Sequence, residues 1–196
     1  MLTVDDLHPK AMDLADAGFL AQKKSQLEDA KMLFQKALEL EKQAALLLSK
    51  DENAEPTRSI LYRSAAALAY HGELYDLADE LILEALSGYP PPEIKQELKA
   101  LSEKVRFQRH FNQIKPQFES DPIHLKGILI YADSTNNSRL GMVKLVEPDT
   151  HQKYSILVPM TLMKSVVKPY YEENVIITAF SDGKEIYFGA INSENA

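Results

Sequence analysis

The sequence contains no cysteine among its 196 residues, which excludes disulfide bonds, thiolate metal sites and a cysteine nucleophile. Its seven glycines are never closer together than six residues, so the common glycine-rich phosphate-binding loops cannot form. The five histidines are scattered, and none has a second histidine at the helical spacing of a zinc site. We therefore expect neither a cofactor nor a metal.

Long hydrophobic runs are also lacking, because no stretch approaches the roughly 18 apolar residues of a membrane span. The first residues, MLTVDDLHPKAMDLADAG, carry acids where a signal peptide needs a basic segment. The formal net charge of −7 argues against a partner held mainly by electrostatics, such as bulk nucleic acid or an anionic membrane. These features predict a cytoplasmic protein with no membrane partner.

The strongest pattern in the chain runs from Ser59 to Glu93. It predicts two amphipathic helices separated near Gly72, because small residues fill the first half and large apolar residues recur at helical spacing in the second. The recurring residues are Leu77, Leu81, Ile82, Ala85 and Leu86.

This stretch resembles a tetratricopeptide repeat, a unit of about 34 residues in two antiparallel helices. The matching positions are Tyr62, Ala65, Ala66, Tyr75, Ala78, Ile82, Ala85 and Pro90. A weaker copy precedes it, with Ala30 in the position of Ala78 and an insertion between the two units. Plain helical hairpins of a bundle are the alternative interpretation, and both describe a scaffold.

A third helical segment is predicted from Glu93 to about Lys115, after the break at Pro90, Pro91 and Pro92. Fewer than three repeats seldom bury a stable core, so we interpret this helix as a cap that completes the array. The helical domain is accordingly predicted to span residues 1–118.

After Pro116, β-branched and aromatic residues dominate in five short runs, which predicts five strands. Asp182-Gly183 predicts a tight hairpin between the last two strands, and 160–168 has helical spacing. The order of three strands, a helix and two strands resembles an oligonucleotide/oligosaccharide-binding barrel. A different small barrel remains open. The fold class is therefore α+β, with a five-stranded β-barrel over residues 122–193.

The resemblance to tetratricopeptide repeats implies a groove that binds a protein segment through side chains of the first helix of each unit. Arginine and aromatic residues are typical of such interaction surfaces. The candidate partner-binding residues are Phe19, Lys23, Arg58, Arg63, Tyr70 and His71. Whether the protein also associates with itself is left open.

A second hypothesis is a single-stranded nucleic-acid-binding module that uses the barrel and the basic run 104–115, where cations alternate with phenylalanine. Its candidate residues are Arg106, Arg109, Lys144, Lys153 and Tyr154. The charge balance disfavours it, because residues 122–196 carry a net charge of −1 and the helical part carries −6.

Catalysis is the least favoured function. Acid pairs such as Asp5-Asp6 and Glu172-Glu173 occur where solvated faces are expected, and no serine lies in a nucleophile-elbow pattern. The combination of helical repeat and small barrel also resembles bacterial proteins to which no activity is assigned. We therefore expect a non-catalytic adaptor or accessory subunit of a bacterial complex.

Overall fold

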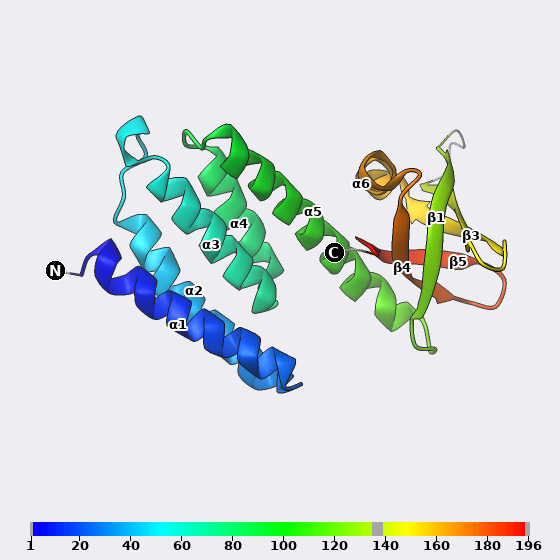
Figure 1. Cartoon of the computed structure of the whole chain (residues 1–196), viewed down its shortest axis with the longest axis horizontal. Helices are drawn as coiled ribbons and strands as arrows, with labels where there is room; N and C mark the ends of the chain where they lie inside the picture. Colours follow the sequence, from blue (N-terminus) through cyan, green and yellow to red (C-terminus); the bar gives the residue numbers. More distant parts are fainter. Residues whose placement is uncertain (1, 135–138, 195–196) are drawn as a thin grey trace. The chain divides into compact units, whose positions relative to one another are not determined.

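The computed structural model describes residues 2–134 and 139–194. The chain divides into two compact units, Met1–Val105 and Arg106–Ala196. We call the first the helical unit and the second the β-unit, and Figure 1 labels the elements of both. The predicted α+β composition is confirmed.

Antiparallel helices stack on one another in the helical unit (Figure 1). Its elements are α1 (Val4–Lys23), α2 (Leu27–Leu46), η1 (Glu52–Ala54), α3 (Thr57–His71), α4 (Tyr75–Leu86) and the first part of α5 (Pro92–Ile114). Helix α1 begins with a capping box, in which the Thr3 side chain accepts from the Asp6 amide and the Asp6 carboxylate accepts from the Thr3 amide.

Alanine makes much of the core of the helical unit. Ala37, Ala65 and Ala78 are completely buried, and small side chains at such positions let neighbouring helices approach closely. Helix α2 is shorter than predicted, because it ends at Leu46 rather than continuing towards Lys50. The Asp51 side chain instead accepts from the amides of Asn53 and Ala54 and starts the short η1 turn.

The β-unit contains the predicted order of three strands, a helix and two strands. Its elements are the end of α5, η2 (Lys115–Gln117), β1 (Ile123–Asp133), β2 (Leu140–Val146), β3 (Lys153–Pro159), α6 (Met160–Tyr170), β4 (Asn174–Ser181) and β5 (Ile186–Ser193). Asp-Gly between β4 and β5 makes the predicted hairpin, in which Gly183 has a φ of 87° that glycine adopts without strain.

The five strands form a mixed sheet that closes on itself in the order β1-β2-β3-β5-β4. All neighbours are antiparallel except β3 and β5, which pair in parallel over a short stretch around Ile156 and Ile186. Strand β1 bends at an irregularity between Leu129 and Tyr131, which lets its first half pair with β4 and its second half with β2. The interior is apolar, with buried residues such as Val143, Ile177 and Phe188.

Helix α5 contributes to both units. Phe107 lies 5.7 Å from Phe188 between ring centres, and Phe111 lies 5.4 Å from Phe180. These contacts group the chain from Arg106 onward with the strands, whereas the sequence had placed the whole of this helix, to residue 118, in the helical domain. Continuous helical periodicity hides such a boundary.

Candidate functional site

Rings from four helices meet where α1 and α3 end and α4 begins. We call these residues the aromatic cluster: Phe19, Phe34, Tyr70, His71 and Tyr75. His71 is central, since its ring centre lies 5.0 Å from Phe19, 5.1 Å from Phe34 and 5.4 Å from Tyr70. Phe34 is buried, whereas Phe19 is 39% exposed and forms the open edge of the cluster.

Close packing of α1 on α2 positions the two phenylalanines. A Cβ atom on Gly18 would lie 2.8 Å from Cε1 of Phe34, so glycine is needed for this approach. The turn after α3 is held by Gln35, whose side-chain amide donates to the Gly72 carbonyl at 2.9 Å. This bond anchors the end of α3 on α2 and fixes His71 beside Phe34.

The aromatic cluster is uncharged at neutral pH. Burial lowers the pKa of His71, and the nearby Lys104 lowers it further, so the imidazole is neutral. Burial also raises the pKa of the Tyr70 hydroxyl, which stays protonated. Exposed cations border the cluster, because Lys104 acts on His71 and Lys23 lies one helical turn after Phe19.

Three of the six predicted partner-binding residues, Phe19, Tyr70 and His71, therefore lie together, and Lys23 lies on the same face of α1 as Phe19. Arg63 is half-buried and forms an ion pair with Glu97 of α5. It faces its own scaffold as well as solvent.

Arg58 does not belong to any exposed groove, and this part of the prediction needs correction. Its side chain is buried, with 1% of the residue exposed, and it forms an ion pair with Glu84 of α4. Its guanidinium also lies 3.9 Å from the Glu55 carboxylate and 4.6 Å from the ring centre of Tyr62. Arg58 therefore ties the loop before α3 to α4 and offers no surface to a partner.

A second buried ionisable group, which sequence reasoning missed, is Glu41 of α2. Its carboxylate oxygens lie 2.8 and 3.0 Å from Nδ1 of His8 on α1. Burial raises the pKa of Glu41, while His8 and Ser64 lower it in part. Its position between Ala37, Leu38, Ala44 and Ala45, which are all core residues, was the available signal.

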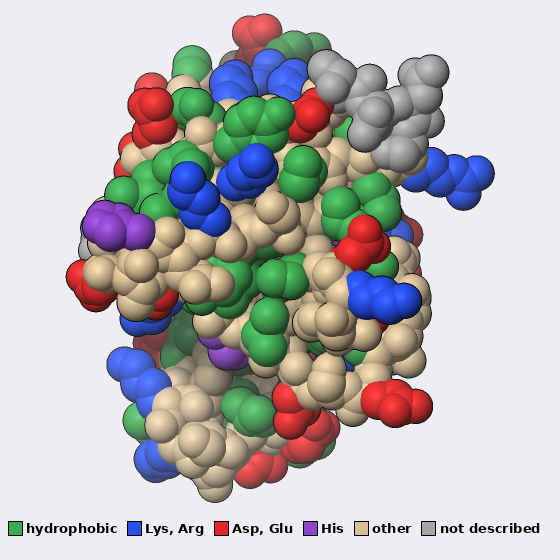
Figure 2. Space-filling view, turned by 90° about the vertical axis from the view of Figure 1, so that its right-hand side faces the viewer, with side chains coloured by type: hydrophobic (Ala, Val, Ile, Leu, Met, Phe, Trp, Pro, Cys, Tyr) green, Lys and Arg blue, Asp and Glu red, His purple; other side chains and the backbone are tan. Residues whose placement is uncertain are grey.

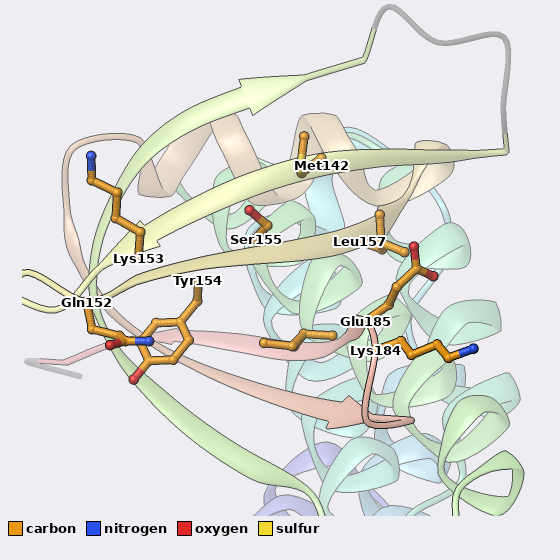
Figure 3. A pocket seen from close by; sticks show the side chains of 9 residues that line it. Met142, Gln152, Lys153, Tyr154, Ser155, Leu157, Lys184 and Glu185 are labelled. Carbon is orange, nitrogen blue, oxygen red and sulfur yellow. The ribbon is translucent and has the colours of Figure 1, made fainter.

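The β-unit carries a separate depression of about 550 Å³ on β2, β3 and the start of β5. Figure 3 shows the side chains around it, with Lys153 and Lys184 at opposite ends. We call it the β2–β3 pocket. Its lining residues are Met142, Gln152, Lys153, Tyr154, Ser155, Leu157, Lys184, Glu185 and Ile186.

Charges around this pocket are mixed. The Asp182 carboxylate accepts from the amides of Lys184 and Glu185 at 2.9 and 2.8 Å, and these bonds hold its pKa below the ordinary value. Tyr187 donates to Glu185, which raises the pKa of Tyr187 to about 12. Figure 2, which looks onto this unit, shows hydrophobic side chains in the middle with both signs of charge around them.

The residues predicted for nucleic-acid contact do not form one surface. Lys153 and Tyr154 line the β2–β3 pocket, whereas Arg106 and Arg109 line a different pocket beside α6. Lys144 lies 4.9 Å from the ring centre of Tyr131, an exposed aromatic residue that the sequence did not single out. Most of the predicted polar loop 133–138 lies outside the described residues.

No protein family, curated protein or solved structure matches this chain. Within the described residues, no three histidine, aspartate or glutamate side chains are placed to hold a metal ion. None of the described helices is long and apolar enough to cross a membrane.

Proposed function

We propose that this protein is a non-catalytic adaptor whose helical unit captures a segment of a partner protein at the aromatic cluster. The observation that carries the proposal is the position of Phe19, which is exposed at the edge of a packed set of rings. Aromatic side chains on a rigid, partly dry surface are typical anchors of protein interfaces.

The resemblance to tetratricopeptide repeats supports the same site. In the alignment, Phe19, Tyr70 and His71 fall on the first helix of each unit, the position from which such repeats bind peptides. The small residues of the pattern, Ala30, Ala37, Ala78 and Ala85, are all buried, as close helix packing in that architecture requires.

The charges around the cluster favour a particular kind of partner. Lys23 and Lys104 are exposed cations in a unit that is otherwise strongly acidic. An acidic segment with an apolar or aromatic anchor would place the anchor on Phe19 and its carboxylates near the lysines, which complements both features.

Affinity capture from a lysate of the source organism tests this function. The variant Phe19→Ala with Lys23→Glu removes the exposed ring and reverses the adjacent charge, and we expect recovery of the bound partner to fall at least about tenfold. Leu20→Ala is the matched control, because Leu20 is 54% exposed on the same helix and lies outside the cluster.

Thermal unfolding of each variant separates lost binding from lost folding. Equal recovery of the same partner by the wild type and by a folded double variant would contradict the site. Loss of that partner with Leu20→Ala alone would place the contact elsewhere on α1.

A second candidate function is binding of single-stranded nucleic acid by the β-unit. The strand order, the parallel β3–β5 pair and the helix before β4 support the resemblance to oligonucleotide/oligosaccharide-binding barrels. In that fold, ligands bind on strands two and three and at the loop between strands four and five, where the β2–β3 pocket lies.

This candidate is tested with a labelled single-stranded oligonucleotide of mixed sequence. Binding through Lys153 and Lys184 should appear at low salt, weaken steeply as salt is added, and decrease when both lysines become glutamine. Lys168→Gln is the control, because Lys168 is exposed outside the pocket. Absence of binding at low salt would remove this candidate.

A further inference from the structure

The last turns of α5 and the first turn of α6 enclose a small cationic pocket within the β-unit. We call it the Arg106–Arg109 pocket, and its volume is about 290 Å³. Its lining residues are Arg106, Arg109, His110, Gln113, Thr161 and Leu162. None of them is acidic, and none is shared with the β2–β3 pocket.

Helical spacing brings the α5 residues onto one face. Positions 106, 109, 110 and 113 follow the i, i+3, i+4, i+7 pattern, so their side chains project to the same side of the helix. Two guanidinium groups therefore stand one turn apart beside the start of α6.

Two of these side chains are held in place by hydrogen bonds to neighbouring elements. Arg106 donates from Nη2 to the Thr161 carbonyl at 2.9 Å, and its Nη1 lies 3.5 Å from Oγ of Ser165. His110 donates from Nε2 to the Phe188 carbonyl at 2.7 Å, and its ring stacks on Phe188. The pocket walls are therefore positioned without a ligand.

The donor chemistry of the pocket matches an oxyanion. Guanidinium presents paired N–H groups that fit two oxygens of one phosphate, and Gln113 and Thr161 add a neutral amide and a hydroxyl. Two positive charges match a phosphomonoester dianion better than a carboxylate, which carries one charge. The volume lies at the lower end of ligand pockets, which suits a single small group.

We propose that the Arg106–Arg109 pocket binds the terminal phosphate group of a small phosphorylated ligand. This site is independent of the aromatic cluster, so it adds a second binding activity to the adaptor proposed above. Failure of either proposal leaves the other standing, since the two sites share no residue.

Chemical-shift titration of the ¹⁵N-labelled full chain tests the proposal. The probes are inorganic phosphate, ribose 5-phosphate, and ribose as the uncharged match. We expect saturable shifts at the amides of Gln113, Thr161 and Leu162 with both phosphates and none with ribose. Absence of saturable shifts at these amides would overturn the site.

Two variants localise the binding. Arg109→Gln should weaken phosphate affinity by about tenfold or more, because a charge-assisted pair is lost. Lys168→Gln removes the same charge from an exposed position on α6 outside the pocket, and it should change affinity by less than about twofold. Equal affinities of a folded Arg109→Gln variant and the wild type would refute the assignment.

A dinucleotide with and without a 5′-phosphate distinguishes a terminal group from a strand backbone. The phosphorylated form should bind more tightly, since only it carries the dianion. Equal affinity of the two forms would contradict the preference for a terminal phosphate.

Discussion

The helical unit and the β-unit bury different kinds of side chain. The helical unit has an alanine-rich core that also contains the buried polar residues Arg58, Glu41 and Ser59. The core of the β-unit is made of valine, isoleucine, leucine, methionine and phenylalanine, and among its described residues no charged side chain is buried.

The difference follows from how each architecture satisfies its backbone. A closed sheet pairs its strands around the whole ring, so its interior needs only apolar side chains. Stacked helices satisfy their own backbones but depend on side-chain contacts to hold one another and their loops. Here Arg58 and Glu41 supply such contacts, which makes the helical unit the one whose stability depends on charge.

The largest expected effect comes from removing the buried ion pair. Arg58→Ala should lower the free energy of unfolding of the helical unit by about 3–5 kcal/mol, because it leaves Glu55 and Glu84 without their cation. Urea unfolding measures the change. Arg63→Ala breaks a half-exposed pair with Glu97 and should cost no more than about 1 kcal/mol.

Equal costs for the two arginine variants would break the comparison, because it would mean that burial does not set the importance of these pairs. A larger cost for Arg63→Ala would reverse their roles.

Adding one methyl group in each unit compares their tolerance to crowding. In Gly18→Ala the new Cβ meets the Phe34 ring, and we expect a loss of about 1–3 kcal/mol as the ring shifts. In Gly189→Ala it would lie 2.8 Å from the Thr178 carbonyl oxygen of the neighbouring strand. A paired backbone cannot move aside as a side chain can, so Gly189→Ala should cost more.

Thermal unfolding of both variants, followed by helix and by sheet signals in circular dichroism, assigns each loss to its unit. A Gly189→Ala variant as stable as the wild type would show that the closed sheet is more deformable than its pairing suggests.

The smallest expected effect is a pH dependence confined to the helical unit. Because the pKa of folded Glu41 is raised above its ordinary value, the protonated carboxyl favours folding. This contribution is fully present below about pH 4.5 and is lost as the pH rises through the folded pKa. The Glu41→Gln variant should therefore gain stability relative to the wild type over that rise.

Urea unfolding at a series of pH values measures this difference. Glu39→Gln is the control, since Glu39 is exposed on the same helix. A difference between wild type and Glu41→Gln that stays constant with pH would contradict the effect of burial on this group.

Much of the fold was predictable because it depends on local pattern. Helical spacing predicted α3 and α4, the Asp-Gly pair predicted the β4–β5 hairpin, and five β-branched runs predicted five strands in the right order. The end of α2 and the division inside α5 were missed, because an apolar helical pattern shows neither which partner it packs against nor where that partner changes.

The candidate site was predictable only in part. Alignment to a repeat placed Phe19, Tyr70 and His71 on related helices, and the structure brings their rings together. The same reasoning placed Arg58 with them, because a charged residue near a helix start is usually exposed. The acidic partners Glu55 and Glu84 make its burial affordable, and Glu84 is 26 residues away in the chain.

By itself the sequence determined the elements: helix periods, strand alternation, caps and turns are set by neighbours within a few residues. Only the tertiary structure decided which cations are scaffold and which line a pocket. Arg58 and Arg109 have the same side chain, yet one is buried against Glu84 and the other stands beside α6. That difference depends on distant residues, because burial and pairing are properties of the packed chain.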